Sequence, residues 1–158
     1  MRIALGALAI SLIADQASKW AVIERMALDQ RLFIPVLDPY LNFAMAWNTG
    51  VNFGLLGSDS ELLRLGLIAL ALAICLGVWI WVWREGAPAS MQLGAGLLIG
   101  GALGNVIDRI RWGAVADFIN MSCCGIRNPY SFNIADAAIF AGAVMLILFS
   151  GRGSSAAR

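Results

Sequence analysis

Two aspartates in a mostly apolar chain, Asp117 and Asp136, are the strongest candidates for chemistry. Neither has a cation three or four residues away, and Asp117 stands between Ala116 and Phe118 in an apolar stretch that we expect to be extended. Two carboxyl groups that lie close together in a low-dielectric site cannot both ionise easily, so one keeps its proton while the other acts as a base. Such a pair can activate a water molecule and protonate a leaving amine. Acids within a membrane also serve proton-coupled transport, so this spacing leaves a small proton-coupled membrane transporter as the alternative.

Two further aspartates have cationic neighbours. Lys19 follows Asp15 by four residues, which is one turn of a helix, and Asp108 has Arg109 or Arg111 nearby. We interpret both acids as members of structural ion pairs that hold helices and loops together.

Composition removes several other kinds of site. The chain contains no histidine, which excludes Ser-His-Asp and Cys-His nucleophile systems and an HExxH zinc site. The cysteines Cys75, Cys123 and Cys124 form neither a disulfide framework nor a CxxC spacing, and we interpret them as small packing residues. No metal or other cofactor is expected. A net charge of +1 without a basic run gives no reason to expect a nucleic-acid partner.

The elements that must position the acids are membrane helices. Of 158 residues, 60% are hydrophobic and only 13% are charged, outside the usual balance of a soluble domain. A bilayer core about 30 Å thick requires about 20 mostly apolar residues for each helix that crosses it. Four segments qualify, at about residues 2–23, 62–83, 91–109 and 132–150. We therefore predict an all-α membrane protein, a single domain over residues 1–158 built as a bundle of four transmembrane helices.

Two long loops, residues 24–61 and 110–131, must lie on the same side of the membrane if there are four spans. Basic residues are denser outside the spans on the opposite side, which favours cytoplasmic termini. Short apolar stretches in the first loop, with Asn48, Gly50, Asn52 and Gly54 as turn residues, predict small strands or a hairpin. We expect a small β-rich extracytoplasmic region on the membrane surface or over the helix ends.

Glycines recur every four residues in the third predicted span, at Gly96, Gly100 and Gly104, with Gly101 beside them. Such a pattern lets a neighbouring backbone approach closely. We expect this close contact to lie within the chain rather than in a dimer.

Helical spacing and the placement of both long loops on one side of the membrane together predict where the polar side chains meet. Asn105 reaches Asp108 and Arg109 within one turn, and Asn133 and Asp136 are three residues apart. The residues expected to converge at one end of the bundle are Asp15, Lys19, Asn48, Asp108, Arg109, Asp117, Asn133 and Asp136.

Five motifs occur in order along the chain: DQASK at residues 15–19, NTGVNFG at 48–54, GNVIDR at 104–109, GAVADF at 113–118 and FNIAD at 132–136. With these motifs the sequence resembles the lipoprotein signal peptidases, the type II signal peptidases of bacteria. One departure is Asn52, where that family usually has a small residue.

The resemblance implies an intramembrane aspartic endopeptidase. It would remove the signal peptide from prolipoproteins next to a cysteine that already carries a diacylglyceryl group. By motif position the catalytic dyad carries over to Asp117 and Asp136. The other matching positions, assigned to substrate binding and to orientation of the dyad, are Asp15, Lys19, Asn48, Gly50, Asn105, Asp108, Arg109, Asn133 and Ala135.

The same resemblance implies where the protein works and with what. The expected partners are the lipidated signal peptide of a prolipoprotein and membrane lipid, and a monomer is expected. The expected location is the bacterial cytoplasmic (inner) membrane, with cytoplasmic termini and an active site near the outer face.

Overall fold

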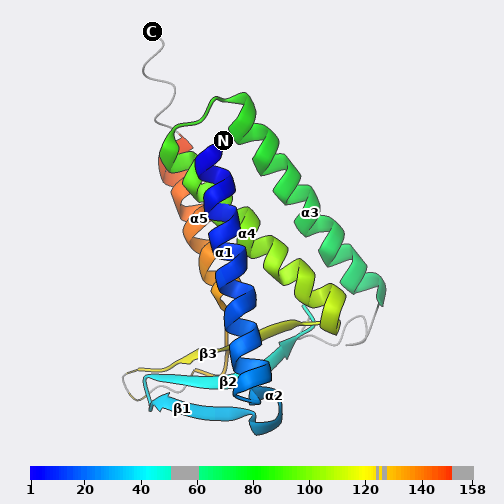
Figure 1. Ribbon diagram of the computed structural model, residues 1–158, viewed down its shortest axis with the longest axis vertical. Helices are drawn as coiled ribbons and strands as arrows, with labels where there is room; N and C mark the ends of the chain where they lie inside the picture. The colour runs from blue at the N-terminus through cyan, green and yellow to red at the C-terminus, as the bar shows by residue number, and fades with distance from the viewer. Residues whose placement is uncertain (51–60, 124, 126–127, 151–158) are drawn as a thin grey trace.

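Four long helices stand over a small sheet in the computed structural model, which describes residues 1–50, 61–123, 125 and 128–150 (Figure 1). The long helices are α1 (Arg2–Trp20), α3 (Glu61–Arg84), α4 (Ala89–Trp112) and α5 (Ile134–Ser150). A π-helical turn, η1 (Ala21–Arg25), and the short α2 (Leu28–Arg31) lead from α1 to the sheet. These helices cover the four segments that the sequence predicts as apolar.

The α3–α4 pair is a hairpin whose ends follow from residue type. Gly86 adopts a left-handed φ of 56°, and Pro88 is the N-cap of α4, so neither helix continues through this connection. At its other end α4 stops at Gly113, which has a left-handed φ of 79° and donates its N–H to Arg109 O at 3.2 Å. Gly113 thereby turns the chain from α4 directly into the strand that carries Asp117.

The sheet is antiparallel, with the order β1-β2-β3. It combines strands from both long loops: β1 (Phe33–Leu37), β2 (Leu41–Asn48) and β3 (Val115–Met121). Ala46 on β2 lies opposite Asp117 on β3. The chain reverses between β1 and β2 across a cis Asp38–Pro39 bond, earlier than the Asn48–Gly54 turn predicted from sequence. Asn48 closes β2 instead, whereas the predicted turn residues Asn52 and Gly54 lie outside the described residues.

Close contacts of the α4 glycines confirm that they pack within the chain. A Cβ on Gly96 would meet Ala4 and Ala7 of α1, and one on Gly100 would meet Ser11 and Leu8 of the same helix. A Cβ on Gly101 would instead meet Ala135 of α5. The central helix α4 is thus held between α1 and α5 by backbone proximity.

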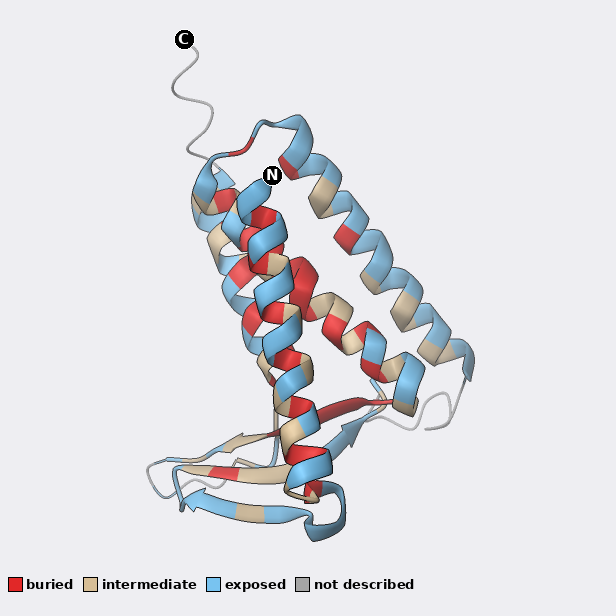
Figure 2. Ribbon diagram, in the orientation of Figure 1, coloured by how far each residue is buried: buried red, intermediate tan, exposed pale blue. Residues whose placement is uncertain are grey.

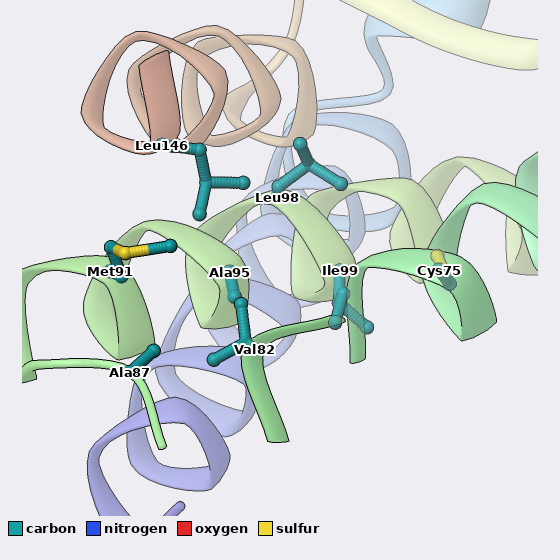
Figure 3. Close-up of a cluster of buried hydrophobic side chains, with 8 residues drawn as sticks. All are labelled: Cys75, Val82, Ala87, Met91, Ala95, Leu98, Ile99 and Leu146. Atoms are coloured by element: carbon teal, nitrogen blue, oxygen red, sulfur yellow. The ribbon is translucent and has the colours of Figure 1, made fainter. Parts of the chain in front are cut away.

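Two apolar clusters occupy opposite ends of the molecule. The cluster at the α3–α4 hairpin joins α3, α4 and α5 through Val82, Ala95, Leu98 and Leu146, among others (Figure 3). The second lies between η1, α2 and the sheet, where the Phe43 and Phe118 rings meet edge to face at 5.8 Å. The polar residues singled out from the sequence lie between these clusters.

Burial differs sharply between the helices. Much of α4 is buried, whereas α3 is exposed along most of its length although it is strongly apolar (Figure 2). By length and composition, α3 and α4 can each cross a membrane, and α5 is a shorter apolar helix. A long apolar helix with so little protein around it is suited to contact with lipid.

Candidate active site

Asp117 is held in the middle of a polar cluster by the strand on which it lies. Its side chain is only 3% exposed. Asn48 at the end of β2 donates Nδ2–H to Asp117 Oδ2 at 3.0 Å, and Asn133 donates Nδ2–H to Oδ1 at 2.7 Å. Both carboxyl oxygens therefore accept a carboxamide hydrogen bond.

Asp136 lies in the first turn of α5 and is fixed by that helix's own cap. Its backbone N–H donates to Asn133 Oδ1 at 2.9 Å, while the backbone N–H of Asn133 donates to Asp136 Oδ2 at 3.3 Å. This reciprocal pair is a capping box with an aspartate in place of the usual glutamate. From α4, Asn105 donates Nδ2–H to Asp136 Oδ1 at 2.9 Å. Asn133 thus binds both Asp117 and Asp136, which makes it the residue that joins the two acids.

Beneath this pair, Lys19 joins two further carboxylates. Lys19 Nζ lies 2.8 Å from Asp15 Oδ2 and 2.6 Å from Asp108 Oδ2, and all three side chains are fully buried. The predicted pairing of Asp15 with Lys19 is confirmed. The predicted pairing of Asp108 with Arg109 or Arg111 is wrong: its cation comes from α1, which helical spacing along α4 cannot show.

This Asp15–Lys19–Asp108 bridge holds the backbone on both sides of the site. Asp15 Oδ1 accepts the N–H of Ala135 at 3.0 Å, and Asp108 Oδ2 accepts the N–H of Ala116 at 3.2 Å. Ala135 immediately precedes Asp136, and Ala116 immediately precedes Asp117. One cation therefore links the two carboxylates that fix the backbone next to each acid of the pair.

Sequence reasoning missed Gln16 as part of this bridge. Its Nε2 donates to Asp15 Oδ2 at 3.1 Å, to Asp108 Oδ1 at 3.1 Å and to Gly104 O at 3.3 Å. A Cβ on Gly104 would also collide with the Asp15 carboxylate, so this glycine makes room for the bridge. The signal was present, because Gln16 belongs to the DQASK motif.

Arg109 lies at the open side of the cluster. Its Nη1–H donates to Asn105 O at 3.4 Å, and no ion pair between Arg109 and a carboxylate is present in the described part of the chain. Gly50 is close by, since a Cβ added there would lie 3.9 Å from Arg109 Nη2. Gly50 donates its N–H to Asn48 Oδ1 at 2.9 Å, which orients the amide that binds Asp117.

The environment of Asp117 alters its acidity. The pKa of Asp117 is raised to about 6, chiefly by burial; the nearby Asp136 contributes to the rise, whereas the hydrogen bonds from Asn48 and Asn133 oppose it. A carboxyl group of this kind exchanges a proton near neutral pH. Within the described residues, no cluster of three histidine, cysteine, aspartate or glutamate side chains is placed to hold a metal ion.

Comparison with known proteins identifies the family of the chain. The family described as Signal peptidase (SPase) II matches residues 7–151, which is most of the chain. The chain belongs to the signal peptidase II family. Members of this family are aspartic peptidases, and the paired acids on β3 and α5 fit that chemistry.

Several relatives support the assignment to signal peptidase II along nearly the whole chain. The lipoprotein signal peptidase of Methylorubrum extorquens (strain PA1) is 42% identical, covering 96% of this chain and 86% of the relative. That of Rhodopseudomonas palustris (strain ATCC BAA-98 / CGA009) is 35% identical, covering 98% of this chain and 96% of the relative.

Solved structures share the fold of this chain. Two solved structures match this chain, and both are described as a bacterial membrane enzyme structure obtained by the in meso method. Their resolutions are 2.3 Å and 1.9 Å. The first has a TM-score of 0.76 and 25% identity, covering 100% of this chain and 93% of that chain. The second has a TM-score of 0.77 and 26% identity, covering 94% of this chain and 92% of that chain. The chain is a bacterial membrane enzyme, mostly helical, with membrane-spanning helices and a small three-stranded sheet.

Proposed function

We propose that Asp117 and Asp136 are the catalytic pair with which this signal peptidase II removes the signal peptide from a prolipoprotein, next to a cysteine that carries a diacylglyceryl group. One observation carries the assignment: Asn133 donates to both carboxylates, through its side-chain amide to Asp117 and its backbone N–H to Asp136, whereas Lys19 pairs with the other two acids of the cluster. Asp117 and Asp136 thus lie together without a cation bonded to either in the described part of the chain.

The environments of the two acids suggest which of them carries the proton. Asp117 lies on a buried strand where burial raises its pKa to about 6, so it retains a proton more readily than an ordinary carboxyl group. Asp136 lies at the N-terminus of α5, where the aligned peptide dipoles stabilise a negative charge. We therefore assign the protonated role to Asp117 and the ionised role to Asp136.

These roles give a hydrolysis in which every proton is accounted for. Asp136 takes a proton from water, the hydroxide oxygen bonds to the carbonyl carbon, and Asp117 gives its proton to the carbonyl oxygen. In the resulting neutral diol, Asp117 takes a proton back from one hydroxyl while Asp136 delivers its proton to the leaving nitrogen. The C–N bond then breaks, a carboxyl group and an amine leave, and both aspartates return to their starting states.

Arg109 is the best candidate to hold the substrate carbonyl. Asn48 and Asn133 already direct their amide donors at Asp117, whereas Arg109 has five N–H donors and makes one long bond to Asn105 O. Gly50 lies beside Arg109 and packs against Leu67, which brings the end of β2 close to the guanidinium group. A donor placed at a carbonyl oxygen as charge develops there stabilises the transition state.

The remaining site residues are assigned to orienting the pair. Asn105 and Asn133 bind the catalytic carboxylates directly. The bridge of Asp15, Lys19 and Asp108, with Gln16, acts one step further away through the amides of Ala116 and Ala135.

Four spans, cytoplasmic termini and an active site near the outer face of the inner membrane complete the proposal, with the enzyme acting as a monomer in contact with membrane lipid. Interfacial residues around the site support this placement. Arg25 stacks over Trp20 at 4.9 Å and Arg111 over Trp112 at 4.6 Å, where α1 and α4 end near the sheet. Aromatic side chains gather at both membrane–water boundaries, so this end of the bundle is suited to an interface, and the denser basic residues on the opposite side favour the outer one.

The test uses purified enzyme with a diacylglyceryl-modified preprolipoprotein and with its unlipidated form. We expect cleavage of the lipidated substrate alone, and no cleavage by Asp117→Asn or Asp136→Asn although both variants insert and fold. Asp29→Asn, at an exposed residue of α2, is the matched control and should cleave normally. Normal turnover by either dyad variant contradicts the assignment, and failure of the wild-type enzyme on both substrates would favour the proton-coupled transporter.

A further inference from the structure

A groove of about 570 Å³ lies over the sheet, outside the cluster that holds the two acids. Residues from all three strands line it, together with the segment that follows β3. The residues on which the argument depends are Asp38, Asn42, Ala44, Ala46, Asn120 and Ser131. None of them has a part in the hydrolysis described above.

Internal hydrogen bonds shape the walls of this sheet groove. Asn120 donates Nδ2–H to the carbonyl oxygens of Asn128 and Tyr130, both at 2.9 Å. Ser131 donates its hydroxyl to Ala44 O at 2.8 Å, and Asn42 donates Nδ2–H to Asp38 Oδ1 at 3.0 Å. The groove is therefore built before any ligand arrives, and small alanine side chains form part of its floor.

The groove reaches the cross-strand neighbour of Asp117. Ala46, at one end, lies opposite Asp117 in the β2–β3 register, whereas Asn42 lies opposite Asn120 toward the other end. An extended chain rises about 3.3 Å per residue, so a peptide along β2 from Ala46 to Leu41 has room for about five residues. When the peptide bond to be cut lies at Asp117, the substrate chain on one side of that bond can therefore extend along the groove.

Polarity decides which side of the substrate takes this path. An apolar signal peptide is stable in lipid beside the bundle, whereas the chain beyond the cleavage point is polar and must leave the bilayer. The groove can bind such a chain through three carboxamides, two hydroxyls and one carboxylate, which lie among apolar residues such as Phe33, Pro35 and Met45. Asp38 is its one charged lining residue in the part of the chain that the structure describes.

We propose that the sheet groove binds the first about five residues of the mature lipoprotein, downstream of the cleaved bond. Asp38 then lies near the far end of this stretch, at about the fourth to sixth mature residue, and favours a basic side chain there over an acidic one. This inference rests on the proposed function, because it requires the peptide bond to be cut at Asp117 and Asp136. It adds a specificity determinant that lies outside the signal peptide.

The experiment compares a short lipidated substrate with a long one made in two versions, and all of them share one signal peptide. One ends two residues after the modified cysteine, and the other continues for eight mature residues with either lysine or glutamate at positions four to six. For the wild-type enzyme, we expect a KM several-fold lower for the long lysine substrate than for the short one. A tenfold difference would correspond to about 1.4 kcal/mol of added binding.

Two variants of the groove separate this effect from catalysis. Ala44→Phe fills the groove and should raise KM for the long substrate to that of the short one, with cleavage of the short one unchanged. Asp38→Lys, at an exposed residue, should reverse the preference between lysine and glutamate. Val36→Phe adds bulk to an exposed residue of β1 outside the groove and should leave every value unchanged.

The outcomes distinguish this inference from the proposed function. Equal KM values for long and short substrates in the wild-type enzyme would overturn the proposal that the groove binds the mature chain. A rise in KM for both substrates in Ala44→Phe would also overturn it, since the groove would then serve the lipid or the signal peptide. Failure to cleave even the short substrate would count against the catalytic assignment instead.

Discussion

Asp117 combines deep burial with a pKa of about 6, and the cause is local. Loss of water around the carboxyl group penalises its ionised form, and two donated hydrogen bonds recover only part of that penalty. The proton-bearing form therefore persists to a higher pH than in an ordinary aspartate. That form is the one required at Asp117 by the hydrolysis proposed above.

The pH dependence of cleavage tests this role through Asn48. The hydrogen bond from Asn48 favours the ionised form of Asp117, so Asn48→Ala should raise the pKa of Asp117. If Asp117 must be protonated, kcat/KM of the free enzyme falls as pH rises through about 6, and in Asn48→Ala this alkaline limb moves to higher pH. An unchanged limb, or one displaced to lower pH, would contradict the role.

At the residue scale, the sequence singled out the two acids but not all of the ion-pair partners of the other two. Asp117 and Asp136 stand out because no cation lies one helical turn away from either. The same rule misassigned Asp108, because Lys19 reaches it from another helix, far away along the chain. Pairing between helices depends on packing, which the spacing within one helix does not contain.

Helix α4 positions the site by approaching two other helices closely. The two edges of its glycine stripe face different neighbours, so Gly100 packs against α1 and Gly101 against α5. Close backbone approach replaces the hydrophobic driving force that lipid cannot supply between helices. The spacing of these glycines predicted close packing, but not which glycine meets which helix.

Substitution of Gly100 tests this packing. A Cβ at Gly100 would overlap Ser11 and the backbone of Leu8, so Gly100→Ala must push α1 away from α4. We expect destabilisation by about 1–3 kcal/mol, measured as a lower Tm in detergent. Gly66→Ala on α3 is the control, because a Cβ there meets nothing within 4 Å. An equal change in Tm for both variants would contradict the prediction that close packing of Gly100 against α1 stabilises the protein.

The Asp15–Lys19–Asp108 bridge joins α1 to α4 and should act through position rather than through substrate contact. Lys19→Met leaves two buried carboxylates without their cation, which should cost about 3–5 kcal/mol of stability. Adding Asp15→Asn and Asp108→Asn removes both charges and should restore much of the Tm. In the restored triple variant we expect a lower kcat with KM nearly unchanged. A higher KM with kcat intact would mean that Lys19 binds substrate.

At the scale of the whole molecule, the helices and the sheet have different roles. The helices provide a membrane scaffold with all of the polar site at one end, and the sheet supplies Asp117 and Asn48 from outside the bundle. Hydropathy predicted the helices because long apolar runs are a local property of the chain. The strand order β1-β2-β3 was not predictable, because it joins segments from two different loops.

Labelling of single cysteines tests the proposed orientation in the membrane. Met121→Cys places a thiol at an exposed position on β3, and Glu85→Cys places one at an exposed position after the last turn of α3. In a background without the native cysteines, a membrane-impermeant maleimide should label Met121→Cys in intact spheroplasts. It should reach Glu85→Cys only after the membrane is opened. The reverse pattern would place the termini outside.

The bridge between α1 and α4 also has a consequence for synthesis of the chain. Asp15 and Lys19 lie one turn apart, so they neutralise each other as soon as α1 forms a helix. Asp108 leaves the ribosome roughly 5 to 20 seconds later at typical rates of translation. The first helix therefore enters lipid with Asp15 and Lys19 already paired. Asp108 joins the same lysine only after α4 has been synthesised.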